Sequence, residues 1–130
     1  ASRYVHGASV EDVPLGRRLI SLGGNAIGRI LFGVGIRDCT NGFRAVKTEI
    51  LNGLPLREDR FEIIVEELYY CRFLAKSFAE VPVVLGNRQG DQRATAFTYG
   101  PKTFYKYLKY AMLSFRRIRP SAIDGKKELA

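Results

Sequence analysis

Apolar residues recur at helical spacing in three stretches of the 130-residue chain. In the first stretch, after Pro14, leucine, isoleucine or alanine returns every three or four positions, which predicts a helix over about residues 15–32. Proline suits the first helical position because its missing N–H has no partner there. The pair Gly23-Gly24 costs about 1 kcal/mol per glycine relative to alanine. We therefore expect the helix to bend there or another backbone to pack close to it.

The other two stretches predict a central helix and a last helix. The central one begins at Asp59, and its buried stripe is formed by Phe61, Ile64, Val65, Leu68, Cys71 and Leu74. A shorter helix before it runs from Thr48, as N-cap, to about Leu54. The last helix spans 101–119 and is amphipathic: lysine, arginine and tyrosine surround an apolar face of Phe104, Leu108, Ala111, Met112, Phe115 and Ile118. A polar tail over 120–130 follows it.

Strand-favouring residues lie between the predicted helices. Strands are expected over residues 2–6, 43–46 and 77–85, with Pro82 marking an edge or a bulge. Strands that alternate with helices predict an α/β layered sheet. Three strands are few for such a sheet, and the chain has no strand–GxGxxG–helix unit, so the sheet is expected to lack its other half. The long polar segment 86–100 is typical of a functional or mobile loop.

Composition narrows the possible partners. Lysine and arginine number 21 against 13 aspartate and glutamate, a net charge of +8, which predicts an anionic partner: phosphate, nucleic acid or an acidic membrane surface. Two cysteines without a CxxC motif, and a single histidine, argue against a zinc site and favour free thiols. No apolar run approaches the length of about 18–20 residues that a membrane span needs.

Four segments carry recognisable motifs. These are residues 2–4 (SRY) followed by 14–21 (PLGRRLIS), residues 37–44 (RDCTNGFR), the helix of 61–68 leading to 80–83 (EVPV), and residues 88–93 (RQGDQR). In this order they resemble motifs in the C-terminal half of family 2 glycosyltransferases of the dolichol-phosphate mannose synthase type, which act on polyprenyl phosphates. The family versions read SRY…W-x-L-x-R-x-x-I-S, D-x-(T/S)-x-G-F-R, E-V-P and R-x-x-G-E-S-K.

The resemblance implies the acceptor-side half of a GT-A, Rossmann-like catalytic domain over residues 1–100. The last helix, 101–119, would lie in the membrane interface, and the polar tail would follow. The parent enzyme would move a hexose, mannose or glucose, from a nucleotide-sugar to a polyprenyl or dolichyl phosphate at the cytoplasmic face of a membrane. A divalent metal, Mg²⁺ or Mn²⁺, would be held mostly by the missing nucleotide-binding half. The isolated chain is therefore expected to be inactive.

The resemblance also assigns an acceptor-phosphate site, to which Arg3, Arg17 and Ser21 correspond, with Arg88 and Arg93 in the fourth family motif. Arginine offers a planar fork suited to phosphate oxygens. Arg17 and Ser21 are four residues apart, hence on one helical face. The family's G-E-S-K is replaced by G-D-Q-R, which keeps the charges and loses the hydroxyl, so the acceptor stays open. Surface arginines without a ligand are the alternative.

Two carboxylates are the catalytic candidates by resemblance, Asp38 and Glu66. From the residues alone, an aspartate before Thr-Asn-Gly is typical of an Asx-turn. A phosphate nucleophile hardly needs a general base, so Asp38 would orient the acceptor or a metal. We expect it to be paired with a metal or an arginine, with Arg37 or Arg44 as candidates. Glu66 lies near the apolar stripe, where a carboxylate needs a partner.

A rival interpretation comes from the charge alone. A small basic protein with tyrosine beside lysine on one helix also suits nucleic acid. The chain has no RNP, KH or zinc-finger pattern. We therefore favour the glycosyltransferase interpretation and expect no nucleic acid among the partners.

Overall fold

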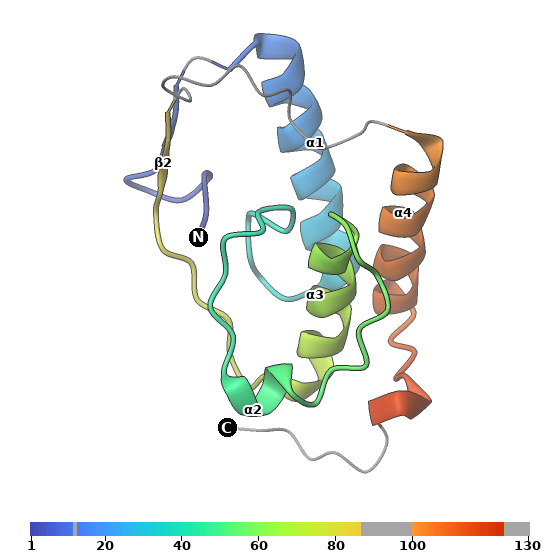
Figure 1. Ribbon diagram of the computed structural model, residues 1–130. Coiled ribbons are helices and arrows are strands. Elements are labelled where there is room, and N and C mark those ends of the chain that lie inside the picture. The colour runs from blue at the N-terminus through green and yellow to red at the C-terminus, as the bar shows by residue number, and fades with distance from the viewer. Residues whose placement is uncertain (12, 87–99, 124–130) are drawn as a thin grey trace.

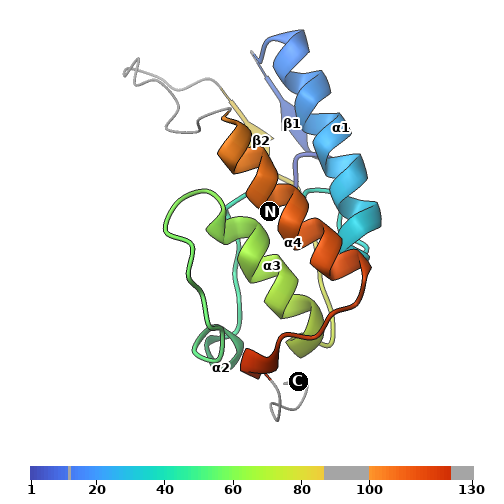
Figure 2. The ribbon, with the colours of Figure 1, turned by 90° about the vertical axis from the view of Figure 1, so that its right-hand side faces the viewer.

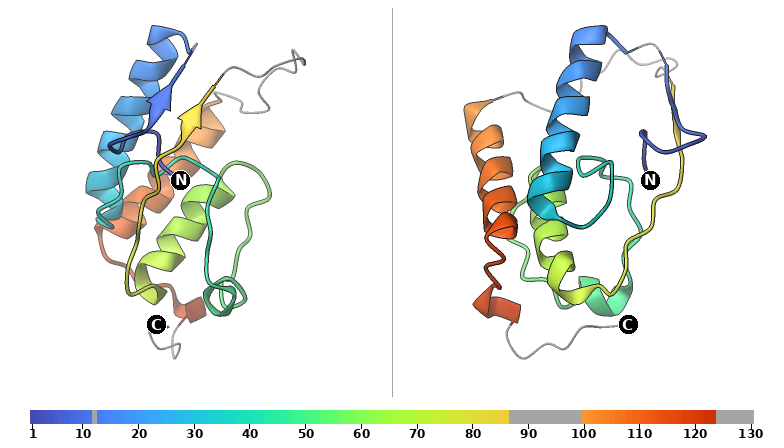
Figure 3. Two further views of the ribbon diagram at one scale, coloured as in Figure 1. Left: turned by 90° about the vertical axis from the view of Figure 1, so that its left-hand side faces the viewer. Right: turned by 180° about the vertical axis from the view of Figure 1, so that it is seen from behind.

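A computed structural model describes residues 1–11, 13–86 and 100–123 (Figure 1). Its helices form two layers beside an extended layer. In the view from behind, α4 stands on one side, α1 and α3 in the middle, and the β2 segment on the other side (Figure 3). The elements in chain order are β1 (Ser9–Val10), α1 (Leu15–Phe32), α2 (Thr48–Leu51), α3 (Ile63–Leu74), β2 (Val84–Leu85), α4 (Pro101–Phe115) and the 3₁₀ turn η1 (Ser121–Ile123).

The described sheet has two short strands, β1 and β2, which pair in parallel with Ser9 opposite Val84. An isolated bridge between Ser2 and Pro82 extends the pairing, since the Ser2 N–H donates to the Val81 carbonyl at 2.8 Å. Mixed helices and a small sheet are compatible with the expected α/β class. The predicted strand positions were largely wrong. The pairing falls at Ser2 and 9–10 instead of 2–6, only the last two residues of 77–85 are strand, and 43–46 is not a strand. A strand is assigned only where a neighbouring strand takes up its backbone groups.

Helix α1 has the predicted bounds, 15–32. Pro14 occupies the N-cap position and not the first helical position. Gly33 ends the helix in the left-handed conformation, φ 64°, and its N–H donates to the Arg29 carbonyl at 3.1 Å. The helix is continuous through Gly23 and Gly24, and a Cβ built on either would meet nothing within 4 Å. Among the described residues, the expected close packing is therefore not at this pair. A close contact occurs one turn later, at Gly28, but its neighbour is the Cys39 side chain and not a backbone.

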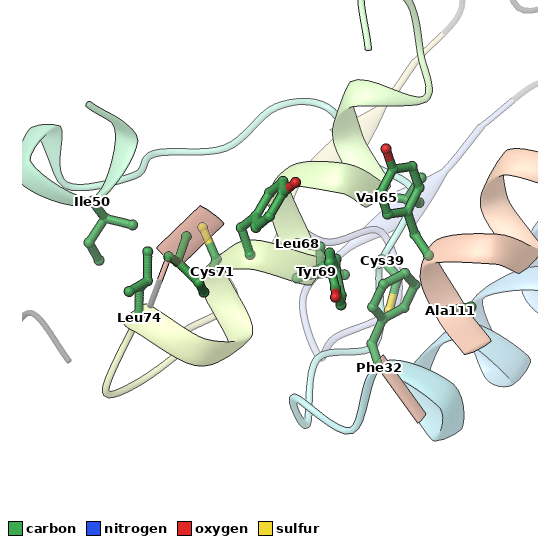
Figure 4. Close-up of a cluster of buried hydrophobic side chains, with 12 residues drawn as sticks. Phe32, Cys39, Ile50, Val65, Leu68, Tyr69, Cys71, Leu74 and Ala111 are labelled. Atoms are coloured by element: carbon green, nitrogen blue, oxygen red, sulfur yellow. The ribbon is translucent and has the colours of Figure 1, made fainter. Parts of the chain in front are cut away.

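Helix α3 forms the centre of the core. It begins at Ile63, four residues later than predicted. Its stripe is buried as expected except at Phe61, which lies before the helix and is exposed. Ile50, Leu74 and Cys71 form one end of the cluster, and Phe32 and Ala111 lie at the other (Figure 4). Tyrosine rings also fill the core: the Tyr69 centroid lies 5.2 Å from that of Tyr70 and 5.8 Å from that of Tyr110.

The last helix and the short helix α2 depart from prediction at their ends. Helix α4 stops at Phe115, not at residue 119, because Arg117 adopts a positive φ of 52° and the chain turns away. Helix α2 stops at Leu51, short of Leu54. Thr48 is the first helical residue of α2, and Lys47 is the N-cap, without a side-chain cap hydrogen bond. The first backbone N–H groups of α2 therefore lack the predicted hydroxyl acceptor.

Helices α1 and α4 pack side by side, and α4 also packs against α3 (Figure 2). Each of these two helices buries a narrow side: Asn25, Gly28 and Phe32 from α1, and Tyr110, Ala111 and Ser114 from α4. Their apolar residues lie largely on the outer surface. The exposed ones are Leu15, Leu19, Ile20, Leu22, Ile27 and Ile30 from α1 and Phe104, Tyr105, Leu108 and Phe115 from α4. These ten residues are called the α1–α4 apolar surface below.

The two glycine environments in α1 give a matched test of the packing. A Cβ at Gly28 would lie 3.3 Å from the Cys39 Cβ, whereas a Cβ at Gly24 would lie in open space. Gly24→Ala should raise the free energy of unfolding by about 1 kcal/mol through helix propensity. Gly28→Ala should lose that gain and about 1–3 kcal/mol more, because the side chain overpacks the contact. Denaturant unfolding of both variants checks this; equal stability would contradict the packing at Gly28.

Candidate functional site

Asp38 and Arg3 form a bidentate ion pair between the N-terminal segment and the turn after α1. Arg3 Nε donates to Asp38 Oδ2 at 2.7 Å, and Nη2 donates to Oδ1 at 2.8 Å. The Arg3 backbone N–H also donates to Oδ2, at 3.1 Å. The Asp38 side chain is fully buried, while that of Arg3 keeps 19% of its surface exposed. A buried carboxylate with two arginine bonds and a backbone bond is well compensated for its lost hydration.

The charge state of Asp38 follows from this geometry. Burial would by itself raise the pKa of the carboxyl. The hydrogen bonds and the positive charge of Arg3 outweigh burial, so the pKa of Asp38 lies below its ordinary value. Asp38 is therefore an anion at neutral pH, suited to hold a cation or to orient an arginine and unsuited to donate a proton.

Ser21 joins the same hydrogen-bonded network from α1. Tyr4 donates its hydroxyl proton to Ser21 Oγ at 2.7 Å. Asn25 Nδ2 donates to the Ser21 carbonyl at 2.9 Å and to Thr40 Oγ1 at 3.0 Å. Arg3 Nη2 also donates to Thr40 Oγ1, at 3.1 Å. Three of the site residues predicted from sequence, Arg3, Ser21 and Asp38, thus lie in one network, although up to 35 residues separate them.

The arginine that pairs with Asp38 is not one of the two expected. Arg44 donates to three backbone carbonyls, those of Cys39 at 2.6 Å, Asn41 at 2.8 Å and Ile64 at 2.7 Å. Arg37 donates its side chain to the Tyr4 carbonyl at 3.3 Å. The expectation of an arginine partner is confirmed, but the partner is Arg3. Arg3 lies far away in sequence, and tertiary contacts bring it to the turn: the N-terminal segment pairs with residues 81–83, and Ala1 bonds to Asn41 and Phe43.

The other predicted phosphate ligands stand apart from this network. Arg17 lies on the exposed surface of α1, one turn before Ser21, and its side chain has no hydrogen bond or ion pair to any described residue. Arg88 and Arg93 lie outside the described residues. Arg17 is thus open to solvent on the side of α1 that also carries Ser21.

Glu66 lies in a separate, fully buried network. One carboxylate oxygen accepts the backbone N–H groups of Arg57 at 3.0 Å and Glu58 at 2.8 Å. The other accepts the Tyr110 hydroxyl at 3.0 Å. Glu58 in turn binds Tyr110 and Lys106, the latter at 2.6 Å. The predicted need for a partner is confirmed. These contacts tie the 57–58 segment and α4 to α3 and share no residue with the Asp38 network.

A cavity of about 230 Å³ borders the Asp38 turn. Its wall combines charged residues, among them Asp38, Arg44 and Glu80, with apolar Ile50 and Leu68. Within the described part of the chain, no three His, Cys, Asp or Glu side chains gather as metal ligands. The carboxylate of Asp38 is directed at Arg3, so these residues do not by themselves make the expected site for Mg²⁺ or Mn²⁺.

Two further observations concern chemistry and the membrane. Cys39 and Cys71 are buried free thiols, as predicted, and burial raises the pKa of each to about 11, so both stay protonated at neutral pH. Over residues 1–11, 13–86 and 100–123, the structure contains no helix with the length and hydropathy of a membrane span.

Comparison with known proteins supports the family resemblance that the motifs indicated. The chain is 34% identical over 112 residues to a dolichol-phosphate mannosyltransferase of Pyrococcus furiosus, a match that covers 84% of this chain and 30% of the relative. It is 34% identical over 97 residues to a polyprenol monophosphomannose synthase of Mycolicibacterium smegmatis, covering 68% of this chain and 34% of the relative. An undecaprenyl-phosphate mannosyltransferase of Micrococcus luteus is 29% identical over 91 residues, covering 68% and 37%.

Homology therefore classes this chain with the glycosyltransferases. More narrowly, its curated relatives are polyprenyl-phosphate mannosyltransferases, and the resemblance seen in the motifs is confirmed. The chain spans about a third of the length of the relatives it matches. No family model and no solved structure matches it.

The Glu66 network makes a testable statement about stability. In Glu66→Gln one carboxylate oxygen becomes an NH₂ group, which cannot accept the hydrogen bonds that the oxygen accepted. The variant should lose about 1–3 kcal/mol in the free energy of unfolding, the cost of buried unsatisfied groups. Glu67→Gln is the control, since Glu67 is partly exposed and lies 3.4 Å from Arg44; it should lose less than about 1 kcal/mol. Equal losses in chemical denaturation would show that the Glu66 contacts contribute little.

Proposed function

We propose that this chain is the acceptor side of a glycosyltransferase that moves a hexose, mannose or glucose, from a nucleotide-sugar to a polyprenyl or dolichyl phosphate. The observation that carries the proposal is the joining of Arg3, Ser21 and Asp38 in one network. These are the residues that the motif resemblance assigns to the acceptor phosphate and the reaction centre. The names of the homologous mannosyltransferases support mannose as the sugar and a polyprenyl phosphate as the acceptor.

The proposed reaction depends little on general acid or general base catalysis. A phosphate oxygen of the acceptor attacks the anomeric carbon of the sugar, and the bond from that carbon to the nucleoside diphosphate breaks. The nucleophile is already anionic at neutral pH, so the chain must bind, neutralise and orient it. Arginine side chains and a serine hydroxyl offer the donors for this task. In the proposal Arg17, Ser21 and Arg3 bind the phosphate, with Arg88 and Arg93 from the following segment.

Asp38 then has an orienting role. Its carboxylate fixes the guanidinium plane of Arg3 through two hydrogen bonds and stays ionised. An anion beside a phosphate would repel it, and the charge of Arg3 between them removes that repulsion. Glu66 is expected to act indirectly, by keeping α4 and the 57–58 segment against α3, since its oxygens bind only groups of the chain itself among the described residues.

The donor side belongs, in this proposal, to a nucleotide-binding half of a GT-A domain outside this chain. Parallel sheets are normally covered on both faces, and a two-stranded sheet is marginal by itself. Here β1 and β2 are two residues each, and Val84 keeps 64% of its surface exposed. Further strands beside them would complete the sheet. The Mg²⁺ or Mn²⁺ expected from the family would be bound mainly by that half.

We further propose that the α1–α4 apolar surface rests on the cytoplasmic face of an anionic membrane. Neither α1 nor α4 contains an acidic residue, and their cations are Arg17, Arg18, Arg29, Lys102, Lys106 and Lys109. An apolar surface on helices whose charged residues are all cations suits the boundary between acyl chains and anionic headgroups. Arg17 and Ser21 lie on α1 on the side of Asn25, away from Leu19 and Ile30, so this placement would hold them about one helix diameter, roughly 10 Å, from the membrane surface.

Acceptor binding is tested in the protein expressed from its complete reading frame, with labelled GDP-mannose or UDP-glucose and a polyprenyl phosphate. Arg17→Ala should raise KM for the acceptor about 10- to 100-fold, the worth of one charged hydrogen bond. The donor KM should stay unchanged. Arg18→Ala is the control, because the next residue projects about 100° away around the helix. A protein that transfers no sugar to polyprenyl phosphate would end the proposal, and equal effects of both arginines would remove Arg17 from the site.

Membrane binding is tested by co-sedimentation with vesicles of phosphatidylserine and phosphatidylcholine. Lys102→Glu with Lys109→Glu should weaken binding at least thirty-fold, since each lysine near an anionic leaflet contributes about 1 kcal/mol. Lys106 is left unchanged because it binds Glu58. Lys47→Glu with Lys76→Glu gives the same charge change away from α1 and α4 and should bind nearly as the parent does. Tighter binding to single-stranded RNA or DNA than to vesicles at one salt concentration would favour the nucleic-acid alternative.

A further inference from the structure

The turn that carries Asp38 has four consecutive backbone N–H groups bound by two side chains from elsewhere in the fold. Glu80, from the segment before β2, accepts the N–H of Arg37 at 2.9 Å and that of Asp38 at 3.1 Å, one on each oxygen. Asn25, from α1, accepts the N–H of Cys39 at 2.7 Å and that of Thr40 at 3.2 Å on its single Oδ1.

Asn25 uses its whole hydrogen-bonding capacity in this way. Its amide group also donates twice, to the Ser21 carbonyl and to Thr40 Oγ1. Only 2% of the residue is exposed. Asparagine is a poor helix former and costs free energy when buried, so an apolar residue would suit this position if packing were the only requirement. Four satisfied bonds, three of them to residues 39 and 40, link it specifically to the turn.

The carbonyl side of the same turn is held by a third residue. Arg44 donates to the carbonyls of Cys39 and Asn41. With the N–H groups fixed by Glu80 and Asn25, the turn is bound on both sides of its backbone. A rotation of the turn would separate Asp38 from Nε and Nη2 of Arg3 and Thr40 from Nη2. Bidentate pairs depend on such alignment.

We propose that Asn25 and Glu80 are positioning residues for the sugar transfer, which hold Asp38 and Thr40 in register with Arg3 and Ser21. They act through the turn and do not touch the substrates. The inference rests on the proposed function for its catalytic consequence, and on the hydrogen bonds of residues 37–40 for its structural content. The two parts are therefore tested separately.

The structural part is tested by amide hydrogen exchange in the protein from its complete reading frame. The N–H groups of residues 37–40 should be protected in the parent. Asn25→Ala should release Cys39 and Thr40 and leave Arg37 and Asp38 protected. Glu80→Gln should make the N–H of Arg37, of Asp38 or of both exchange faster, because the amide nitrogen of glutamine cannot accept a hydrogen bond. Leu74→Val, a buried change in α3, is the control for general destabilisation and should leave all four protected.

Rapid exchange of these four amides in the parent, or continued protection of Cys39 and Thr40 in Asn25→Ala, would overturn the inference. Asn25→Asp guards against a variant that fails to fold, since its carboxylate keeps an acceptor for both N–H groups. It should retain protection at Cys39 and Thr40 while losing the donations to Ser21 and Thr40. This outcome does not depend on any enzymatic activity, so it decides the structural part even if no sugar transfer is found.

The catalytic part is tested by kinetics. Asn25→Ala and Glu80→Gln should each lower kcat on the order of 10- to 100-fold, the scale expected from a misplacement of about 1 Å. KM for the donor should be unchanged. In an Asp38→Asn background neither substitution should lower kcat further, because the residue they position is already disabled. A structural defect alone would lower kcat by the same factor in both backgrounds, and that result would overturn the positioning role.

Discussion

The ion pair between Arg3 and Asp38 is the contact on which the arrangement of the site depends. It joins the N-terminal segment to the turn after α1, and the carboxylate it neutralises has no exposed surface. Loss of one partner from a buried pair leaves an uncompensated charge, at a cost of about 3–5 kcal/mol. Other contacts support the same junction. The N-terminal segment pairs in parallel with residues 81–83, and the turn is bound by Glu80 and Asn25. The two segments also bond directly, since the Ala1 ammonium donates to the Phe43 carbonyl at 2.9 Å and Asn41 Nδ2 donates to the Ala1 carbonyl at 3.1 Å.

The molecule keeps its two carboxylate networks apart. The one around Asp38 is built from the N-terminal segment, α1, the 37–41 turn and Glu80, and it borders a cavity. The one around Glu66 is built from α3, α4 and the 57–58 segment and lies inside the helical layer. The first contains the residues that the proposal gives to the acceptor, and the second fixes the helix that the proposal gives to the membrane. A single chain thus presents a polar site and an apolar surface that share α1.

The distribution of apolar residues connects fold to proposed function. Helices that pack only against a core turn their leucines and isoleucines inward. In α1 the buried residues include Asn25 and Gly28, while Leu15, Leu19 and Ile30 are exposed. In the proposal a lipid surface takes the place of a protein core on that side. Because the apolar residues of α1 face outward, its inner side is free for hydrogen bonds and close packing. A polar residue, Asn25, can therefore bind the turn from there.

The sequence by itself determined where the main helices lie and to which protein family the chain belongs. Apolar periodicity located α1 at its true bounds and most of the α3 stripe, because both depend on local spacing, and the ordered motifs identified the homologous mannosyltransferases. The tertiary structure decided which charges meet. Arg3 and not Arg37 or Arg44 pairs with Asp38, and Glu66 lies away from it, since these contacts span 35 residues or join separate helices. It also decided the strands, whose hydrogen bonds require a partner that no local pattern supplies. Asn25 and Glu80 were not predicted for the same reason. Each binds backbone N–H groups of a distant turn, and since every residue except proline has such a group, the sequence does not show which side chain will bind it.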